Sequence, residues 1–531
     1  MVTTNQQVES RPDPRRWWAL GALVASMLVL GFDMTILNVA LPTIAGDLGA
    51  TSGQQQWMAD AYLVVFAALM LPAGLLGDRF GRRRMLIAGL GVFLAASLVG
   101  AFAGDVSWVI AARALMGVGG ALVMPLAISV LPSLFPRGEQ TRAIGMISAA
   151  SALGMPLGPI IGGWLLNHYW WGSVFVLNVS MVAIGITACL FLLPESKDPT
   201  APKVDIVSTV LTALGLGALI YAIIEGPAKG WSDGLVIGAF AGAVALLGAL
   251  VLRERRSESP MLDLALLGRR GFLSNTIAAT LCMFVLSGVM FLLPQYLQAV
   301  LGTDSLGTGI RMLPLVGGML LAARLAQPLV VKFGTRAVVV MALVVLAFAA
   351  FLGARSTVDS GYGFTALWLS IAGIGIAFAM IPAMGGALGT LARDQAGRGS
   401  GLLSTVRQTG SALGVALLGA LVAGAYSSRL STGGLPDRAA DVARDSVIGA
   451  HVVAGKLGDH ALTASANSAY LHGMDLALVV IGMVALATAL ISAVLMPRRP
   501  APRHHRGPTP PAEQPADSGA EVAPVSADAG Q

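Results

Sequence analysis

Long apolar runs separated by short polar segments make up most of this chain. A run of about 20 apolar residues is long enough to cross the hydrocarbon core of a bilayer as a helix. Applying that length predicts fourteen spans, near residues 17–39, 57–77, 85–104, 107–131, 143–166, 171–194, 205–225, 233–252, 272–294, 306–331, 336–354, 362–389, 401–424 and 473–495. The pattern therefore predicts an all-α polytopic membrane protein.

Composition supports this prediction and excludes several other classes. Of the 531 residues, 55% are hydrophobic and 12% charged, which is too apolar for a soluble protein. The 65 glycines fit helices that pack closely in lipid. Cys189 and Cys282 both fall inside apolar runs, so neither a disulfide framework nor a thiol metal site is indicated. The first apolar run is long and lacks a cleavage site, so it predicts an uncleaved span.

The distribution of basic residues predicts the orientation. Lys and Arg concentrate in cytoplasmic loops of membrane proteins. If the N-terminus is inside, 24 of the 34 Lys and Arg residues fall in inner segments and six in outer loops. Both termini are then cytoplasmic, and the net charge of +6 reflects topology rather than nucleic-acid binding. Residues 425–472 read as a polar outer loop, and the Pro- and Ala-rich tail 498–531 reads as disordered.

The loop between spans two and three has the sequence "GLLGDRFGRRRML", residues 74–86. Gly74 and Gly77 allow close helix approach, Asp78 can pair with an arginine, and Gly81 permits a tight turn before Arg82 and Arg83. One interpretation is a cytoplasmic latch between two helical bundles. The alternative is that its basic residues only fix the orientation of the chain in the membrane.

This loop resembles the signature of the major facilitator superfamily, G-x-L-x-D-R-x-G-R-R/K, with Gly74, Leu76, Asp78, Arg79, Gly81, Arg82 and Arg83 in place. Fourteen spans narrow the resemblance to its drug:proton antiporters. "DMTILNVALP" in span one, "GMPLGPIIGG" in span five, "WWGSVFVLNV" and residues 397–419 resemble the same group. "RALMGVGGA" in span four resembles R-x-x-Q-G-x-G-x-A, although Met116 replaces the usual Gln. The resemblance covers residues 17–497.

The resemblance implies two six-helix bundles that rock around a central cavity. It divides the chain into a cytoplasmic tail (1–16), an N-terminal bundle (17–195), two inserted helices (196–252), a C-terminal bundle (253–497) and the tail 498–531. In span five it implies a helix that favours export over uptake, formed by Gly154, Pro156, Gly158, Pro159, Gly162 and Gly163. The alternative for this helix is a small-residue packing seam.

Asp33 and Arg113 are the leading candidates for proton coupling. Asp33 lies about 24 Å along span one, and Arg113 lies about two turns into span four from the outside, so their depths are comparable. An ionisable residue at membrane depth is by default a functional hypothesis. Burial opposes ionisation of a carboxyl and a guanidinium favours it, so a cationic substrate and a proton would compete at Asp33. The alternative is that the two charges only neutralise each other.

Other charged residues are weaker candidates. Asp60, in the first turn of span two, and Glu225, at the outer end of span seven, are either coupling residues or interface residues. Arg311 and Arg324 lie in the tenth span, which has no acid, and their role stays open. We expect no acid deep in the C-terminal half, which disfavours divalent cations. Arg407 lies near the inner end of span thirteen, from which it can reach the interface.

The sequence thus predicts a proton-driven exporter of hydrophobic, cationic drugs or antibiotics in a bacterial plasma membrane, acting as a monomer. No nucleotide-binding or metalloprotease motif is present, so the proton gradient is the expected energy source and no cofactor or metal is expected. An exporter of a lipid or endogenous metabolite is the alternative. An enzyme or sensor is disfavoured because no catalytic cluster appears.

Overall fold

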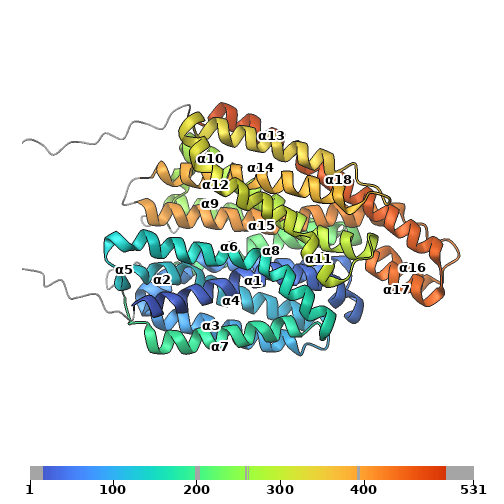
Figure 1. Cartoon of the computed structure of the whole chain (residues 1–531), viewed down its shortest axis with the longest axis horizontal. Coiled ribbons are helices and arrows are strands. Elements are labelled where there is room, and N and C mark those ends of the chain that lie inside the picture. The colour runs from blue at the N-terminus through green and yellow to red at the C-terminus, as the bar shows by residue number, and fades with distance from the viewer. Residues whose placement is uncertain (1–15, 198–203, 258–259, 261, 392–394, 498–531) are drawn as a thin grey trace, which may run out of the picture. The chain divides into compact units, whose positions relative to one another are not determined.

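The computed structural model describes residues 16–197, 204–257, 260, 262–391 and 395–497. The tail 498–531 and all but the last residue of the tail 1–16 lie outside the described residues, so the expected disorder of 498–531 stays a prediction. The described chain is helical (Figure 1).

Within the described residues, fourteen helices, or pairs of consecutive helices, are long and apolar enough to span a membrane, which confirms the predicted number. The first bundle contains α1 (Arg16–Leu48), α2 (Ser52–Phe80), α3 (Arg82–Ala101), α4 (Val106–Ser129), the short α5 (Leu131–Leu134), α6 (Arg137–His168) and α7 (Ser173–Leu192). The inserted pair is α8 (Ile206–Lys229) and α9 (Gly234–Arg256). The second bundle contains η1 (Leu264–Gly268), α10 (Arg270–Gln295), η2 (Tyr296–Val300), α11 (Ser305–Arg311), α12 (Leu313–Phe333), α13 (Thr335–Gly353), α14 (Tyr362–Gly389), α15 (Ala396–Arg429) and α18 (His460–Leu495).

Local sequence sets where these helices begin. Thr51 forms a capping box with Gln54 at the start of α2, and Asp105, Asp233 and Asp459 each accept backbone N–H groups at the starts of α4, α9 and α18. Asp205 caps α8 in the same way. These caps satisfy backbone donors that would otherwise lack partners at the helix ends.

The inserted pair covers one seam between the two bundles. α8 packs against α2 of the first bundle and α15 of the second. An apolar cluster fills this seam, with Val64 and Ala67 from α2, Ile220 and Ile224 from α8, and Ala416 from α15 among its members. We call it the α8 seam.

Residues 425–472 are largely helical. α15 continues to Arg429, α16 (Asp437–Asp445) and α17 (Val447–Leu457) form a hairpin, and α18 begins at His460. The Tyr426 hydroxyl donates to the Ala443 carbonyl at 2.8 Å, and the Ser52 hydroxyl donates to the Asp445 carbonyl at 2.5 Å. The hairpin is therefore held to both bundles.

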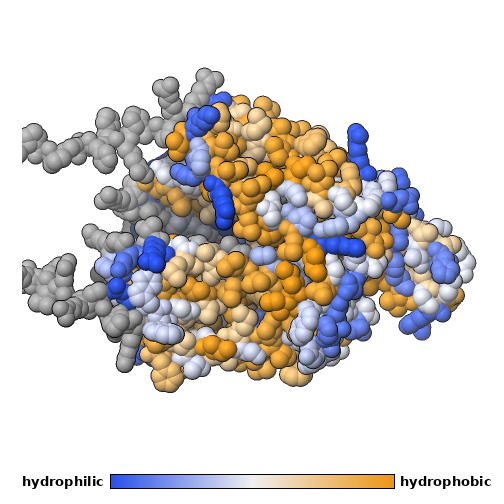
Figure 2. Space-filling view, in the orientation of Figure 1, coloured by the Kyte–Doolittle hydropathy of each residue, from blue (hydrophilic) through white to orange (hydrophobic). Residues whose placement is uncertain are grey.

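We call the side that carries α5 and both ends of the described chain the α5 side, and the opposite side the α17 side (Figure 1). On the α17 side the bundles touch: the Gln298 amide donates to the Val39 carbonyl at 3.0 Å. A Cβ at Gly309 of α11 would lie 2.2 Å from the Pro159 carbonyl oxygen of α6. On the α5 side a hollow separates the bundles (Figure 2). On the face seen in Figure 2 the bundles therefore meet on the α17 side and are separated by a hollow on the α5 side, while α2 and α15 stay in contact at Leu71 and Gly401.

Candidate functional site

Asp33 and Arg113 form an ion pair inside the first bundle. Arg113 Nη1 lies 2.7 Å from Asp33 Oδ2, and the two residues are 3% and 1% exposed. Asn178 of α7 donates its amide to Asp33 Oδ1, also at 2.7 Å. Both carboxylate oxygens therefore have a donor, which is the condition under which a buried carboxylate can stay ionised. The structure brings the two leading candidates together and adds Asn178.

Arg113 has further partners that fix its position. Its Nε donates to the Met58 carbonyl at 3.2 Å, and its guanidinium carbon lies 4.6 Å from the centre of the Tyr62 ring. Its Nη1 also lies 3.9 Å from the sulfur of Met116, the residue that replaces the usual Gln in the span-four pattern. Since α1, α2, α4 and α7 all contribute to it, this network joins four helices of one bundle.

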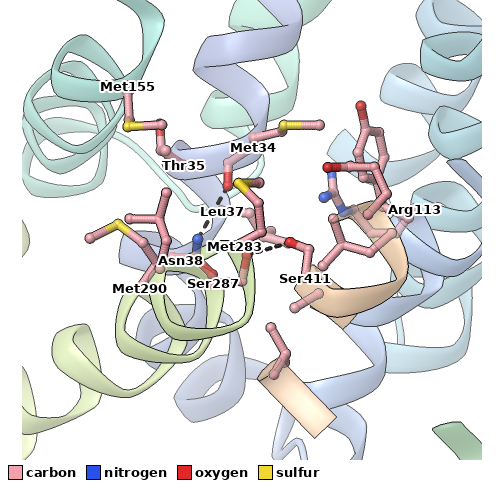
Figure 3. Close-up of a pocket in the computed structure, with 16 residues that line it drawn as sticks. Met34, Thr35, Leu37, Asn38, Arg113, Met155, Met283, Ser287, Met290 and Ser411 are labelled. Atoms are coloured by element: carbon pink, nitrogen blue, oxygen red, sulfur yellow. Dashed lines mark hydrogen bonds between the residues drawn. The ribbon is translucent and has the colours of Figure 1, made fainter. Parts of the chain in front are cut away.

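A cavity of about 80 Å³ lies between the two bundles next to this network (Figure 3). Its wall carries methionines from α1, α6 and α10 together with neutral polar groups, among them Met34, Asn38, Met155, Met283, Ser287, Met290, Gln408 and Ser411. Met side chains are flexible and polarisable, so they adapt to different apolar ligands. The volume is below the ~300–1,000 Å³ of typical ligand sites, so a drug-sized molecule needs the bundles to move apart.

Arg113 lines this cavity, whereas Asp33 does not. The guanidinium therefore stands between the cavity and the carboxylate. A charge placed in the cavity acts first on Arg113, and through Arg113 on the state of Asp33.

Asp60 lies in a different environment from the one its sequence position indicated. α2 begins at Ser52, so Asp60 is in the third turn rather than the first. It is fully buried, and neither carboxyl oxygen has a hydrogen-bond partner among the described residues. Asp60 does not line the central cavity. It lies on the same face of α2 as Gln56 and Val64, and Val64 packs in the α8 seam.

Glu225 is paired near the α17 side. Its Oε2 lies 3.1 Å from Lys229 Nζ, one turn later in α8. Its Oε1 would lie 3.9 Å from a Cβ built on Gly53 at the start of α2. The structure therefore places Glu225 at the contact between α8 and α2.

The glycines of the fifth span pack directly on α1. A Cβ at Gly154 would lie 2.7 Å from backbone atoms of Gly31 and Phe32, and one at Gly158 would lie 2.0 Å from Thr35 Oγ1. A Cβ at Gly162 would lie 2.4 Å from Cγ1 of Ile36. These three glycines hold α6 against the helix that carries Asp33.

The neighbouring residues of α6 reach the second bundle. A Cβ at Gly163 would lie 2.4 Å from the Ser305 carbonyl oxygen of α11, and the Pro159 carbonyl faces Gly309. Pro156 and Pro159 both lie inside α6. One helix thus contacts both the Asp33 helix and the closed α17-side interface.

The loop between α2 and α3 is anchored within the first bundle. Arg82 pairs with Asp78 at 2.8 Å, Gly81 has φ 112°, and the backbone N–H of Arg83 donates to Glu195 after α7. Gly77 leaves no room for a Cβ beside Leu126 of α4. Among the described residues, the hydrogen bonds and ion pairs of this loop lead to its own bundle, and its role as a latch between the bundles stays a prediction.

The second bundle bears on two further expectations. Asp475 of α18 is partly buried near Tyr296, which follows α10 on the α17 side, and its Oδ1 has no partner among the described residues. The absence of an acid deep in this half therefore stays a prediction, whereas the expectation for Arg407 is wrong. Arg407 does not reach the interface: its Nη1 contacts the sulfur of Met384 at 3.2 Å, and its Nε is buried. Arg311 lies 5.2 Å from the Tyr362 ring, and Arg324 is exposed.

Sequence reasoning missed Asn178, the polar cavity residues Gln408 and Ser411, and Asp475. A signal existed for Asn178, a lone amide six residues into a span at the α17 side. Asp475 lies at the start of the apolar run, and α18 begins 15 residues earlier, at His460. Within the described ranges, no three His, Cys, Asp or Glu side chains gather as a metal site would require.

Comparison with known protein families gives one match that covers most of the chain. The family model described as "Major Facilitator Superfamily" matches residues 23–415. Among solved structures, a bacterial homologue of the human lysosomal transporter Spinster, in an inward-facing and unoccupied conformation, superposes with a TM-score of 0.68 at 19% identity, over 93% of this chain and 100% of that one.

Characterised relatives carry names of export and resistance proteins. The chain is 33% identical to the "Tetracenomycin C resistance and export protein" of Streptomyces glaucescens, over 90% of this chain and 91% of the relative. It is 34% identical to the puromycin resistance protein of Streptomyces alboniger, over 80% and 85%. It is 32% identical to the multidrug efflux pump LfrA of Mycolicibacterium smegmatis, over 92% and 98%.

Proposed function

The chain belongs to the major facilitator superfamily, and on that premise we propose that it exports hydrophobic, cationic drugs or antibiotics in exchange for protons. The names of its relatives support export of drugs. The apolar, Met-rich cavity between the bundles supports a hydrophobic substrate. The basic loops support an α5 side that faces the cytoplasm, so the structure represents the state that receives substrate from inside.

One observation carries the coupling proposal: Arg113 lines the cavity while its partner Asp33 lies behind it. With Asp33 ionised, the pair is neutral and a cation can enter the cavity. When Asp33 takes up a proton, the charge of Arg113 is no longer balanced and repels the cation. Substrate and proton then exclude each other through Arg113, although they do not share one binding atom.

This arrangement fits the direction of an exporter. In the inward-open state Asp33 has two donors, Arg113 and Asn178, which favour the ionised form and hence proton release to the cytoplasm. In an outward-open state protonation from outside would free Arg113 and expel the substrate. α6 connects the Asp33 helix to the α17-side interface, so it can link closure of that interface to the site.

A drug panel tests the proposal in a host that lacks its own pumps. Cells producing the protein should tolerate higher concentrations of hydrophobic cations than cells producing the Asp33→Asn variant, and a protonophore should remove the difference in drug accumulation. Protection against neutral drugs alone would contradict the cationic substrate. Protection against no drug, with the protein present in the membrane, would contradict drug export and favour export of a lipid or endogenous metabolite.

A further inference from the structure

A second cavity, of about 420 Å³, lies on the α5 side between α2, α4 and the inserted helix α8. Its lining is almost entirely apolar, with Leu69, Pro72, Ala73 and Leu76 from α2, Val118 and Leu122 from α4, and Val204, Ile206 and Thr209 at α8. We call it the α2–α8 groove. Its volume lies within the ~300–1,000 Å³ range of small-molecule sites.

Among the described residues that line the groove, one carries a charge, the guanidinium of Arg79. Arg79 lines it together with Phe80, whose ring centre lies 5.7 Å from the guanidinium carbon. The neighbouring carboxylates are engaged elsewhere: Asp78 pairs with Arg82 and Asp205 pairs with Arg253. In the part of the chain that the structure describes, no carboxylate lies within ion-pair distance of Arg79.

The position of the groove limits what can occupy it. Arg79 is in the last turn of α2, at the end of a span, and Ile206 beside it is 71% exposed. The groove therefore opens on the lipid-facing surface at the level where phospholipid headgroups begin. An alkyl chain matches its apolar wall, and a phosphate matches the planar, bidentate donors of an arginine. A cationic drug would be repelled by Arg79.

We propose that the α2–α8 groove binds an anionic phospholipid, with one acyl chain against α2, α4 and α8 and the phosphate on Arg79. Basic pockets between membrane helices on the cytoplasmic side are suited to such headgroups. The lipid bridges the first bundle and the inserted pair. This site does not overlap the central cavity, and the proposal does not depend on drug export.

Native mass spectrometry of the purified full-length protein in mild detergent tests this proposal. Phosphatidylglycerol and phosphatidylcholine with identical acyl chains are titrated separately. The wild type should retain phosphatidylglycerol more tightly. Arg79→Gln should lower the affinity for phosphatidylglycerol about fivefold, the amount expected for one guanidinium near an anionic headgroup, and leave phosphatidylcholine unchanged. Thr209→Trp, which fills the groove, should weaken both lipids.

Lys332→Gln is the matched control. Lys332 is also in the last turn of a helix that ends on the α5 side, and its Nζ lies 5.3 Å from the Phe333 ring, but it does not line the groove. The affinity of Lys332→Gln for phosphatidylglycerol should equal that of the wild type. Each variant is first checked by its melting temperature without added lipid. Equal affinity of Arg79→Gln and the wild type, or equal binding of the two lipids, would overturn the proposal.

Discussion

Asp33 and Asp60 are both buried carboxyl groups of the first bundle, but they differ in their partners. Asp33 is held by Arg113 and Asn178 at 2.7 Å each, next to the central cavity. Asp60 is at least as deeply buried and has no hydrogen-bond partner among the described residues. An unpaired carboxylate ion is costly at membrane depth, so we expect Asp60 to be the neutral acid. Burial alone therefore does not identify a carboxyl group as the coupling site. A coupling carboxyl also needs a charged partner that a proton can replace.

Replacing Asp33 should have the largest effect. Asp33→Asn should abolish drug-dependent proton movement in proteoliposomes. It should also destabilise the protein by up to ~3–5 kcal/mol, because Arg113 is left as a buried charge without a counter-ion. Proton movement is followed with a pH-sensitive dye inside the vesicles, and stability by thermal unfolding in detergent.

The double variant Asp33→Asn/Arg113→Gln separates these two effects. It removes both charges, so it should recover most of the stability while coupling stays absent. Recovery of coupled transport in the double variant would mean that the ion pair has a structural role only and that the proton binds elsewhere.

A smaller effect is expected where α6 meets the Asp33 helix. Gly158→Ala places a Cβ 2.9 Å from the Phe32 carbonyl oxygen, so the backbone of α1 or α6 must shift. Overpacking of this kind costs roughly 1–3 kcal/mol. Gly145→Ala in the same helix is the control, because its Cβ meets nothing within 4 Å. Equal melting temperatures of the two variants would argue against a tight contact between α1 and α6.

Replacing Asp60 should raise the stability of the protein rather than lower it. Asp60→Leu replaces an unpaired acid in an apolar seam with a side chain of similar size, so the protein should gain stability by about 1–3 kcal/mol, the cost of a buried polar group without a partner. Drug-dependent proton movement should persist. If Asp60→Leu folds but loses coupling, the contrast between the two acids fails and Asp60 becomes a proton-binding residue.

The sequence predicts the spans well because hydropathy and length are local properties. It also predicts the Asp33–Arg113 pair, because depth along a helix follows from residue count. It does not predict that Arg113 rather than Asp33 lines the cavity, since the face a helix turns inward depends on its neighbours. The burial of Asp60 escapes detection for a similar reason: α8 and α15 both pack on α2, and no pattern in α2 indicates contacts with helices from other parts of the chain.

The smallest effect concerns the anchor of that covering helix. Asp205 caps α8 and pairs with Arg253 of α9 at 3.0 Å. Partial burial alone would raise the pKa of the Asp205 carboxyl, but hydrogen bonds from Arg253 and Ser208 outweigh it and leave this pKa below its usual value. A lowered pKa in the folded state contributes stability above the unfolded pKa of about 3.9, and this contribution disappears as the pH falls through the folded value.

Asp205→Asn keeps the helix cap and removes the ion pair, so it should cost only about 0.2–1 kcal/mol at pH 7, as exposed pairs do. Once the pH has fallen below the lowered pKa of Asp205 in the folded state, the wild type and the variant should melt at the same temperature, because the wild-type carboxyl is then protonated as well. Asp233→Asn is the matched control, since Asp233 caps α9 through Leu235 and Val236 and has no ion-pair partner among the described residues. A pH-independent difference between Asp205→Asn and the wild type would show that Asp205 anchors α8 by shape rather than by charge.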